Sequence, residues 1–133
     1  MTSKVIYDGN LRTRLTHVYS GTEITNDAPL DNQGLAQSFS PTDLCATSLA
    51  SCMITIMGIK ARDMGLDLTG TEIEVTKVMA ANPRRIAEIQ ATLRFPQNNF
   101  TERDKAVLEA AGRNCPVSKS LHPDIKQELT FIW

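Results

Sequence analysis

The stretch SPTDLCATSLASC, from Ser40 to Cys52, carries a helix start signal and two of the three cysteines of the chain. Ser40 can accept hydrogen bonds from the unpaired amide groups of a first helical turn, and Pro41 has the backbone angle that this turn needs. Asp43, three residues after Ser40, completes the pattern of a capping box. The sequence therefore predicts a helix that begins at Pro41 and contains both cysteines.

The residues that follow keep an apolar, helical pattern. Apolar side chains recur every three to four positions, and no charged residue occurs between Asp43 and Lys60. A helix without a charged face is mostly buried. We expect this helix to run to about Met64 and to stop at Gly65.

Strand-like patterns precede the helix. Residues 4–7 and 11–19 are rich in β-forming residues and enclose the turn formers at 8–10, which predicts a hairpin. A short β-like run follows at 22–25. Residues 26–39 are rich in turn formers and should form the loop that leads to the helix.

Further elements follow the helix. A second hairpin is expected at residues 71–80 and 85–95. A helix that runs towards Cys115 follows at 101–115, then a short helix at 116–122 and a last strand at 128–133. Strands thus lie on both sides of the apolar helix. This order predicts an α+β fold rather than a parallel array of βαβ units.

The composition indicates one globular domain over residues 1–133, with 41% hydrophobic and 22% charged residues. The net charge of -1 comes from interspersed acids and bases, which argues against nucleic acid or an anionic membrane as a partner. The N-terminal residues lack a signal-peptide pattern, and no segment approaches 18 consecutive apolar residues. We therefore expect a cytoplasmic protein.

The spacing of the cysteines limits their chemistry. Cys45 and Cys52 lie about 10 Å apart along a helix, too far for a disulfide, so Cys52 could pair only with a residue from elsewhere, and Cys115 is the remaining cysteine. No CxxC or HxxxH element is present, and His17 and His122 lie in different segments. A metal site is therefore not expected.

Each of the two candidate reactive cysteines could instead have a purely structural role. Pro116 predicts that Cys115 caps the next helix, where the helix dipole would ease loss of the thiol proton; the alternative is a chance neighbour of a proline. Cys52 on an apolar helix is either inert packing or a nucleophile with a nearby cation. Arg12 and Arg14 could supply this cation, although arginines in hairpins are commonly solvated.

The SPTDLCATSLASC stretch together with NCPVSK, from Asn114 to Lys119, resembles the osmotically inducible protein C (OsmC) and organic hydroperoxide resistance (Ohr) superfamily. The order of strands and helices agrees over nearly the whole chain. The resemblance implies an intertwined homodimer, in which a curved antiparallel sheet wraps around central helices and the active sites lie at the subunit interface.

The resemblance also implies thiol peroxidase chemistry. Cys52 matches the peroxidatic cysteine, whose thiolate attacks the O–O bond of an organic hydroperoxide and leaves an alcohol and a sulfenic acid. Cys115 matches the resolving cysteine, which condenses with that sulfenic acid to form a Cys52–Cys115 disulfide. An external dithiol, a dihydrolipoyl group in the better-studied branches, then reopens the disulfide, and no bound cofactor is implied.

The chain departs from the superfamily pattern at three places. Thr42 occupies the position of a glutamate that holds the catalytic arginine in the hydroperoxide resistance branch, and the acid is shifted to Asp43. Arg12 matches that arginine approximately and Arg14 less well. Cys45 is an additional cysteine, of a kind found in less-characterised relatives.

Two functional hypotheses follow. The first is an oxidative stress enzyme that reduces organic hydroperoxides, with an apolar substrate pocket that includes Leu49, Met53 and Ile56. The second is a non-catalytic or redox-sensing dimer that keeps the fold and binds a small apolar molecule. A cysteine hydrolase is weaker than either, because neither histidine has a recognisable orienting partner.

Overall fold

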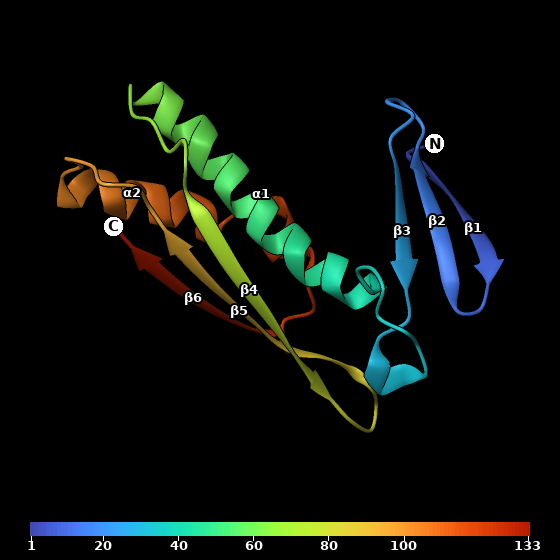
Figure 1. Ribbon diagram of the computed structural model, residues 1–133. Coiled ribbons are helices and arrows are strands. Elements are labelled where there is room, and N and C mark those ends of the chain that lie inside the picture. Colours follow the sequence, from blue (N-terminus) through green and yellow to red (C-terminus); the bar gives the residue numbers. More distant parts are fainter. The chain divides into compact units, whose positions relative to one another are not determined.

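The computed structural model describes all of residues 1–133, and the chain forms two compact units (Figure 1). The first unit is Met1–Cys45 and the second is Ala46–Trp133. Each contains one three-stranded sheet, and helices and strands occur in the order of an α+β protein. The predicted fold class is confirmed, whereas the single domain over residues 1–133 stays a prediction.

The first unit is an antiparallel sheet of three strands in the order β1 (Ser3–Gly9), β2 (Arg12–His17) and β3 (Glu23–Asp27). The predicted first hairpin is therefore confirmed. Its turn needs three successive residues with positive φ, of which Gly9 has φ +88° and Leu11 has φ +61°. The loop that follows β3 contains one 3₁₀ turn, η1 (Leu30–Asn32).

Helix α1 (Pro41–Asp63) begins as the sequence predicts. The Ser40 N–H donates to Asp43 Oδ2 at 2.8 Å, and the Asp43 N–H donates to Ser40 Oγ at 3.1 Å, which together form the capping box. Gly65, with φ +70°, follows the end of the helix. By length and hydropathy α1 could span a membrane, but such helices also form the cores of globular proteins. Six of its 23 residues are buried, so the expectation of a mostly buried helix is wrong for the single chain.

The sheet of the second unit has the order β4 (Glu72–Ala80), β5 (Arg85–Arg94) and β6 (Lys126–Ile132). β4 and β5 form the predicted second hairpin. β6, however, pairs with β5 in parallel, which the strand pattern does not predict. The reason is the helical connection between them, because it returns the chain to the end of the sheet where β5 begins.

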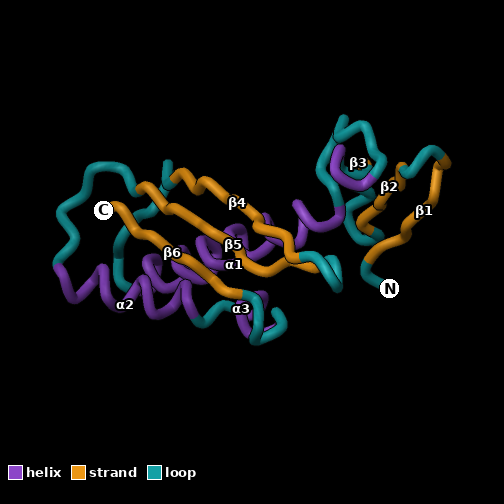
Figure 2. The backbone as a smooth tube through the Cα atoms, turned by 90° about the horizontal axis from the view of Figure 1, so that it is seen from below, coloured by secondary structure: helices purple, strands orange, loops and turns teal.

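Two helices form that connection, α2 (Glu102–Arg113) and the short α3 (Pro116–Ser120). α1 and α2 lie on one face of the sheet (Figure 2), and the side chains between helices and sheet are buried. The core includes Leu49, Met53 and Met57 of α1, Ile89, Ala91 and Leu93 of β5, and Leu108 of α2. Exposed polar residues alternate with buried ones along β5, as expected for a sheet that is covered on one face.

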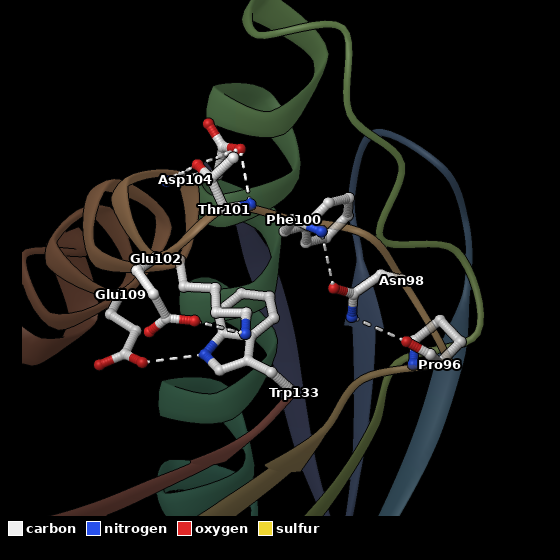
Figure 3. A network of polar contacts seen from close by, with 9 residues as sticks. Pro96, Asn98, Phe100, Thr101, Glu102, Asp104, Glu109 and Trp133 are labelled. Carbon is white, nitrogen blue, oxygen red and sulfur yellow. Dashed lines mark hydrogen bonds and ion pairs between the residues drawn. The ribbon is translucent and has the colours of Figure 1, made fainter.

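The C-terminal residue is held by aromatic contacts and by a polar contact with Glu109, of which Figure 3 shows the polar one. The Trp133 ring stacks on Phe95 with centroids 3.7 Å apart and contacts the edge of Phe100. Its indole N–H donates to Glu109 Oε1 of α2 at 2.9 Å. These contacts fasten the end of β6 to α2, so the last strand and the preceding helix support one another.

Candidate active site

Cys52 lies on the fourth turn of α1, next to the buried face of the helix. Its neighbour Met53 is fully buried, whereas Cys52 itself is only half-buried. The apolar helix thus places a thiol at the margin of the core. A partly exposed thiol can be reached by a small substrate, which a fully buried one cannot.

Cys115 is the N-cap of α3, as the sequence predicts. The Ser118 N–H donates to Cys115 Sγ at 3.4 Å, and Pro116 occupies the first turn. The thiol is nevertheless fully buried, and this burial raises the pKa of Cys115 above its ordinary value. The Ser118 and Val117 N–H groups of the cap lower this pKa, but desolvation raises it more, so the expected net easing of proton loss at Cys115 is wrong.

The structure brings the two candidate thiols close to one another. A hydrogen bond and an electrostatic interaction between the side chains of Cys52 and Cys115 both contribute to the raised pKa of Cys115. None of the three cysteines is in a disulfide. The β4–β5 hairpin and α2 separate Cys52 from Cys115 in sequence, but they fold so that the start of α3 lies near the fourth turn of α1.

Arg12 is held by a carboxylate that the sequence pattern does not indicate. Arg12 Nη2 donates to Asp27 Oδ2 at 3.1 Å and Arg12 Nε donates to Asp27 Oδ1 at 3.3 Å, a two-point ion pair across β2 and β3. The same Nη2 donates to Gln37 Oε1 at 2.6 Å. The Arg12 side chain is 38% exposed, whereas that of Asp27 is 2% exposed. The buried carboxylate therefore holds the guanidinium in place while part of the guanidinium stays accessible to solvent.

The electrostatics agree with this geometry. The hydrogen bonds from Arg12 lower the pKa of Asp27, with a further contribution from the Gln37 N–H at 3.0 Å. Asp27 in turn raises the pKa of Arg12. A cavity of about 260 Å³ lies beside the pair and is lined by Asp8, Gly9, Asn10, Arg12, Asp27, Leu35 and Gln37. The guanidinium is therefore an oriented cation with open space next to it.

The remaining predicted polar residues have other environments. The Asp43 carboxylate accepts the Ser40 N–H of the helix cap, and the Thr42 hydroxyl lies 3.1 Å from the Ser40 hydroxyl. The acid that holds Arg12 is thus Asp27 rather than Asp43. Arg14 pairs with Asp8 at 3.2 Å on the neighbouring strand.

The predicted pocket residues belong mostly to the core. Leu49 and Met53 are fully buried, and Ile56 is half-buried. Their role as walls of a substrate pocket stays a prediction. A larger cavity, of about 580 Å³, lies at the C-terminal end of α1 and is lined by Ile54, Gly58, Ala61, Arg62, Gly65, Leu66, Asp67, Leu68 and Thr69. No group of three or more His, Cys, Asp or Glu side chains is arranged to hold a metal ion.

Comparison with known proteins identifies the family. The profile of the family described as OsmC-like protein matches residues 33–130, which include Cys52 and Cys115. The chain belongs to the OsmC family. Among curated protein sequences none matches this OsmC-family chain.

Solved structures agree with the assignment. A Psychrobacter arcticus 273-4 protein, provisionally named an osmotic stress induced and detoxification response protein, is 53% identical over 98% of the OsmC-family chain and 95% of its own, with a TM-score of 0.94. An organic hydroperoxide resistance protein OsmC of Legionella pneumophila is 14% identical over 100% and 98% of the two chains, with a TM-score of 0.78.

OhrB, the organic hydroperoxide resistance protein of Bacillus subtilis, is 17% identical over 98% of both chains, with a TM-score of 0.71. The Legionella pneumophila and Bacillus subtilis structures share the fold of the OsmC-family chain. The resemblance that the two cysteine motifs indicate, and the OsmC/Ohr fold expected from it, are confirmed.

Proposed function

We propose that this OsmC-family protein is a peroxide-detoxifying enzyme that reduces organic hydroperoxides through a pair of cysteines. The proximity of the Cys52 and Cys115 thiols carries the proposal, because a two-cysteine peroxidase needs a second thiol near the one that reacts first. Relatives of the same fold that are called organic hydroperoxide resistance proteins support the substrate class.

The first step in the proposed reaction takes place at Cys52. The half-buried thiol gives up its proton, and its sulfur attacks the terminal oxygen of the hydroperoxide. The O–O bond breaks, Cys52 becomes a sulfenic acid, and the alkoxide leaves as an alcohol with one proton. The predicted cation for this step is Arg12, since Asp27 and Gln37 orient its guanidinium while leaving it partly exposed.

The second step takes place at Cys115. Its sulfur bonds to the Cys52 sulfur, the S–O bond of the sulfenic acid breaks, and the hydroxide leaves as water with the Cys115 proton. Two exchange reactions with an external dithiol, which we expect to be a dihydrolipoyl group, return both thiols. A cytoplasmic location fits this cycle, because thiols stay reduced there.

The homodimer is proposed together with the reaction. Val5, Leu15 and Ile24 form one row across the first sheet, with Tyr7 on the same face of β1. Val5 is 61% exposed and Tyr7 is 65% exposed in the single chain. An apolar sheet face of this kind is expected to be covered by a partner, and light scattering after gel filtration tests whether that partner is a second copy.

The function is tested by steady-state consumption of cumene hydroperoxide and of hydrogen peroxide with dihydrolipoamide as reductant. We expect turnover that prefers the organic peroxide, is lost in Cys52→Ser and is strongly reduced in Cys115→Ser. Cys45→Ser is the matched control and should keep parental turnover. A Cys52→Ser variant that consumes peroxide as fast as the parent would refute the proposal.

Thr42, in place of a superfamily acid, keeps one alternative open: a redox-sensing dimer that binds a small apolar molecule. Such a sensor would also lose two thiols to one equivalent of peroxide. It would not go through repeated cycles with a dithiol, so multiple turnover decides between sensor and enzyme.

A further inference from the structure

A glycine of α2 lies against the two methionines that follow Cys52 on α1. A Cβ atom added at Gly112 would lie 2.8 Å from Met57 Sδ, 3.0 Å from Met57 Cγ and 3.8 Å from Met53 Cε. Gly112 is buried, and its φ lies outside the left-handed region. Glycine is therefore needed here because there is no space for a side chain, and not because of an unusual backbone conformation. Gly112 lies in the last turn of α2, and its contact with the two methionines explains why a residue without a side chain stands there.

The glycine contact is linked directly to the thiol pair. Met53 is the neighbour of Cys52 in sequence, and the Cys115 N–H donates to the Gly112 carbonyl at 3.1 Å. The distance between α1 and α2 at Gly112 therefore determines how near the Cys115 backbone comes to Cys52. Met53 and Met57 are both fully buried, so neither can swing into solvent to make room for an added methyl group.

We propose that Gly112 is a positioning residue for disulfide formation, because its missing side chain lets α2 approach α1 closely enough for Cys115 Sγ to reach the sulfur of Cys52. The role in peroxide reduction rests on the proposed function, whereas the approach of the two thiols does not. When Cys115 lies too far away, the Cys52 sulfenic acid persists, and a second hydroperoxide oxidises it to the sulfinic acid while a second alcohol leaves.

The test compares Gly112→Ala with Gly58→Ala. Gly58 also lies in a helix, but a Cβ added there meets nothing within 4 Å, so its variant controls for the change of glycine to alanine itself. Far-ultraviolet circular dichroism checks that both variants fold. The readouts are the rate of the first oxidation of Cys52, the lifetime of the sulfenic acid trapped with dimedone, and the rate of Cys52–Cys115 bonding followed by intact mass.

In Gly112→Ala we expect the first oxidation to proceed at the parental rate and disulfide formation to slow by about tenfold or more, with sulfinic acid accumulating in excess peroxide. Gly58→Ala should match the parent in every readout. A merely structural defect would not separate the two steps. Parental disulfide formation in a folded Gly112→Ala variant would overturn the proposal.

A second arm oxidises the thiols with diamide instead of peroxide, and thereby separates this inference from the proposed function. If diamide forms the Cys52–Cys115 disulfide more slowly in Gly112→Ala than in Gly58→Ala, the positioning role is supported even if the parent reduces no peroxide. Equal rates of disulfide formation in the two variants overturn it. Met57→Ala removes the two nearest atoms, so Gly112→Ala/Met57→Ala should recover fast bonding. If Gly112→Ala does not fold, the folded double variant is used instead, and the proposal is overturned if this variant forms the Cys52–Cys115 disulfide more slowly than the parent.

Discussion

Oxidation of Cys52 and Cys115 to a disulfide is expected to stabilise the protein by about 4 kcal/mol. The bond closes a loop of about 60 residues, for which the chain-entropy relation gives a loss of about 14 cal/mol/K in the unfolded state. The two thiols already lie close to one another in the reduced protein, so we expect the folded state to form the bond without unfolding. Most of the entropic effect should therefore appear as stability.

Urea unfolding followed by circular dichroism measures this effect, with peroxide-oxidised and dithiol-reduced protein at one fixed protein concentration. With an m-value of about 2 kcal/mol/M, a difference of 4 kcal/mol moves the unfolding midpoint by about 2 M urea. Holding the concentration fixed matters because a dimer unfolds in a concentration-dependent way.

Matched variants make the stability measurement specific. Cys45→Ser should keep the full shift between oxidised and reduced protein, and Cys115→Ser should lose it. The bond itself is confirmed by intact mass before unfolding. Equal midpoints for reduced protein and for protein with a verified Cys52–Cys115 disulfide would refute the reasoning, because they would mean that strain in the folded state cancels the loop entropy.

Three further predictions follow from individual contacts. Asp27→Asn removes the carboxylate that orients Arg12, so hydroperoxide consumption should slow by about tenfold or more while the urea midpoint shows a folded protein; an unchanged rate would contradict the role of the pair. Trp133→Ala should lower the free energy of unfolding by about 3 kcal/mol in urea titrations, and Trp133→Phe, which still stacks, by less than half of that. The Thr101 hydroxyl lowers the pKa of Asp104, so the stability from this cap is complete above the unfolded-state pKa of about 4 and is lost as the pH falls through the lower folded-state pKa. Asp104→Asn should therefore make the urea midpoint fall less steeply in acid than it does in the parent. Equal pH profiles for the parent and the variant would contradict this role of Asp104.

Local signals were sufficient for much of the fold. The start of α1 follows from Ser40 and Asp43, because a capping box uses only neighbouring residues. The hairpin turn before β2 follows from its turn formers in the same way. The parallel pairing of β6 with β5 could not be predicted from the pattern, since an alternating strand looks the same in either direction.

The features of the candidate site that depend on neighbouring residues could also be predicted from the sequence, whereas those that depend on the tertiary fold could not. The cysteine motifs and the family resemblance indicated Cys52 and Cys115, and the structure brings them together. Asp27 was missed as the partner of Arg12, because the pairing depends on the register between β2 and β3. The raised pKa of Cys115 cannot be predicted from Pro116, because the helix cap lowers this pKa whereas burial, which depends on the whole core, raises it more.

The difference between the two thiols gives the proposed reaction its order. Cys52 is half-buried and can meet a hydroperoxide, whereas Cys115 is fully buried and holds its proton more strongly than an ordinary cysteine. A buried, protonated thiol is a poor first nucleophile, and it is shielded from the peroxide that would otherwise consume it. It can still react with a sulfur atom that already lies close to it. Burial of Cys115 thus protects the second thiol until the first has been oxidised.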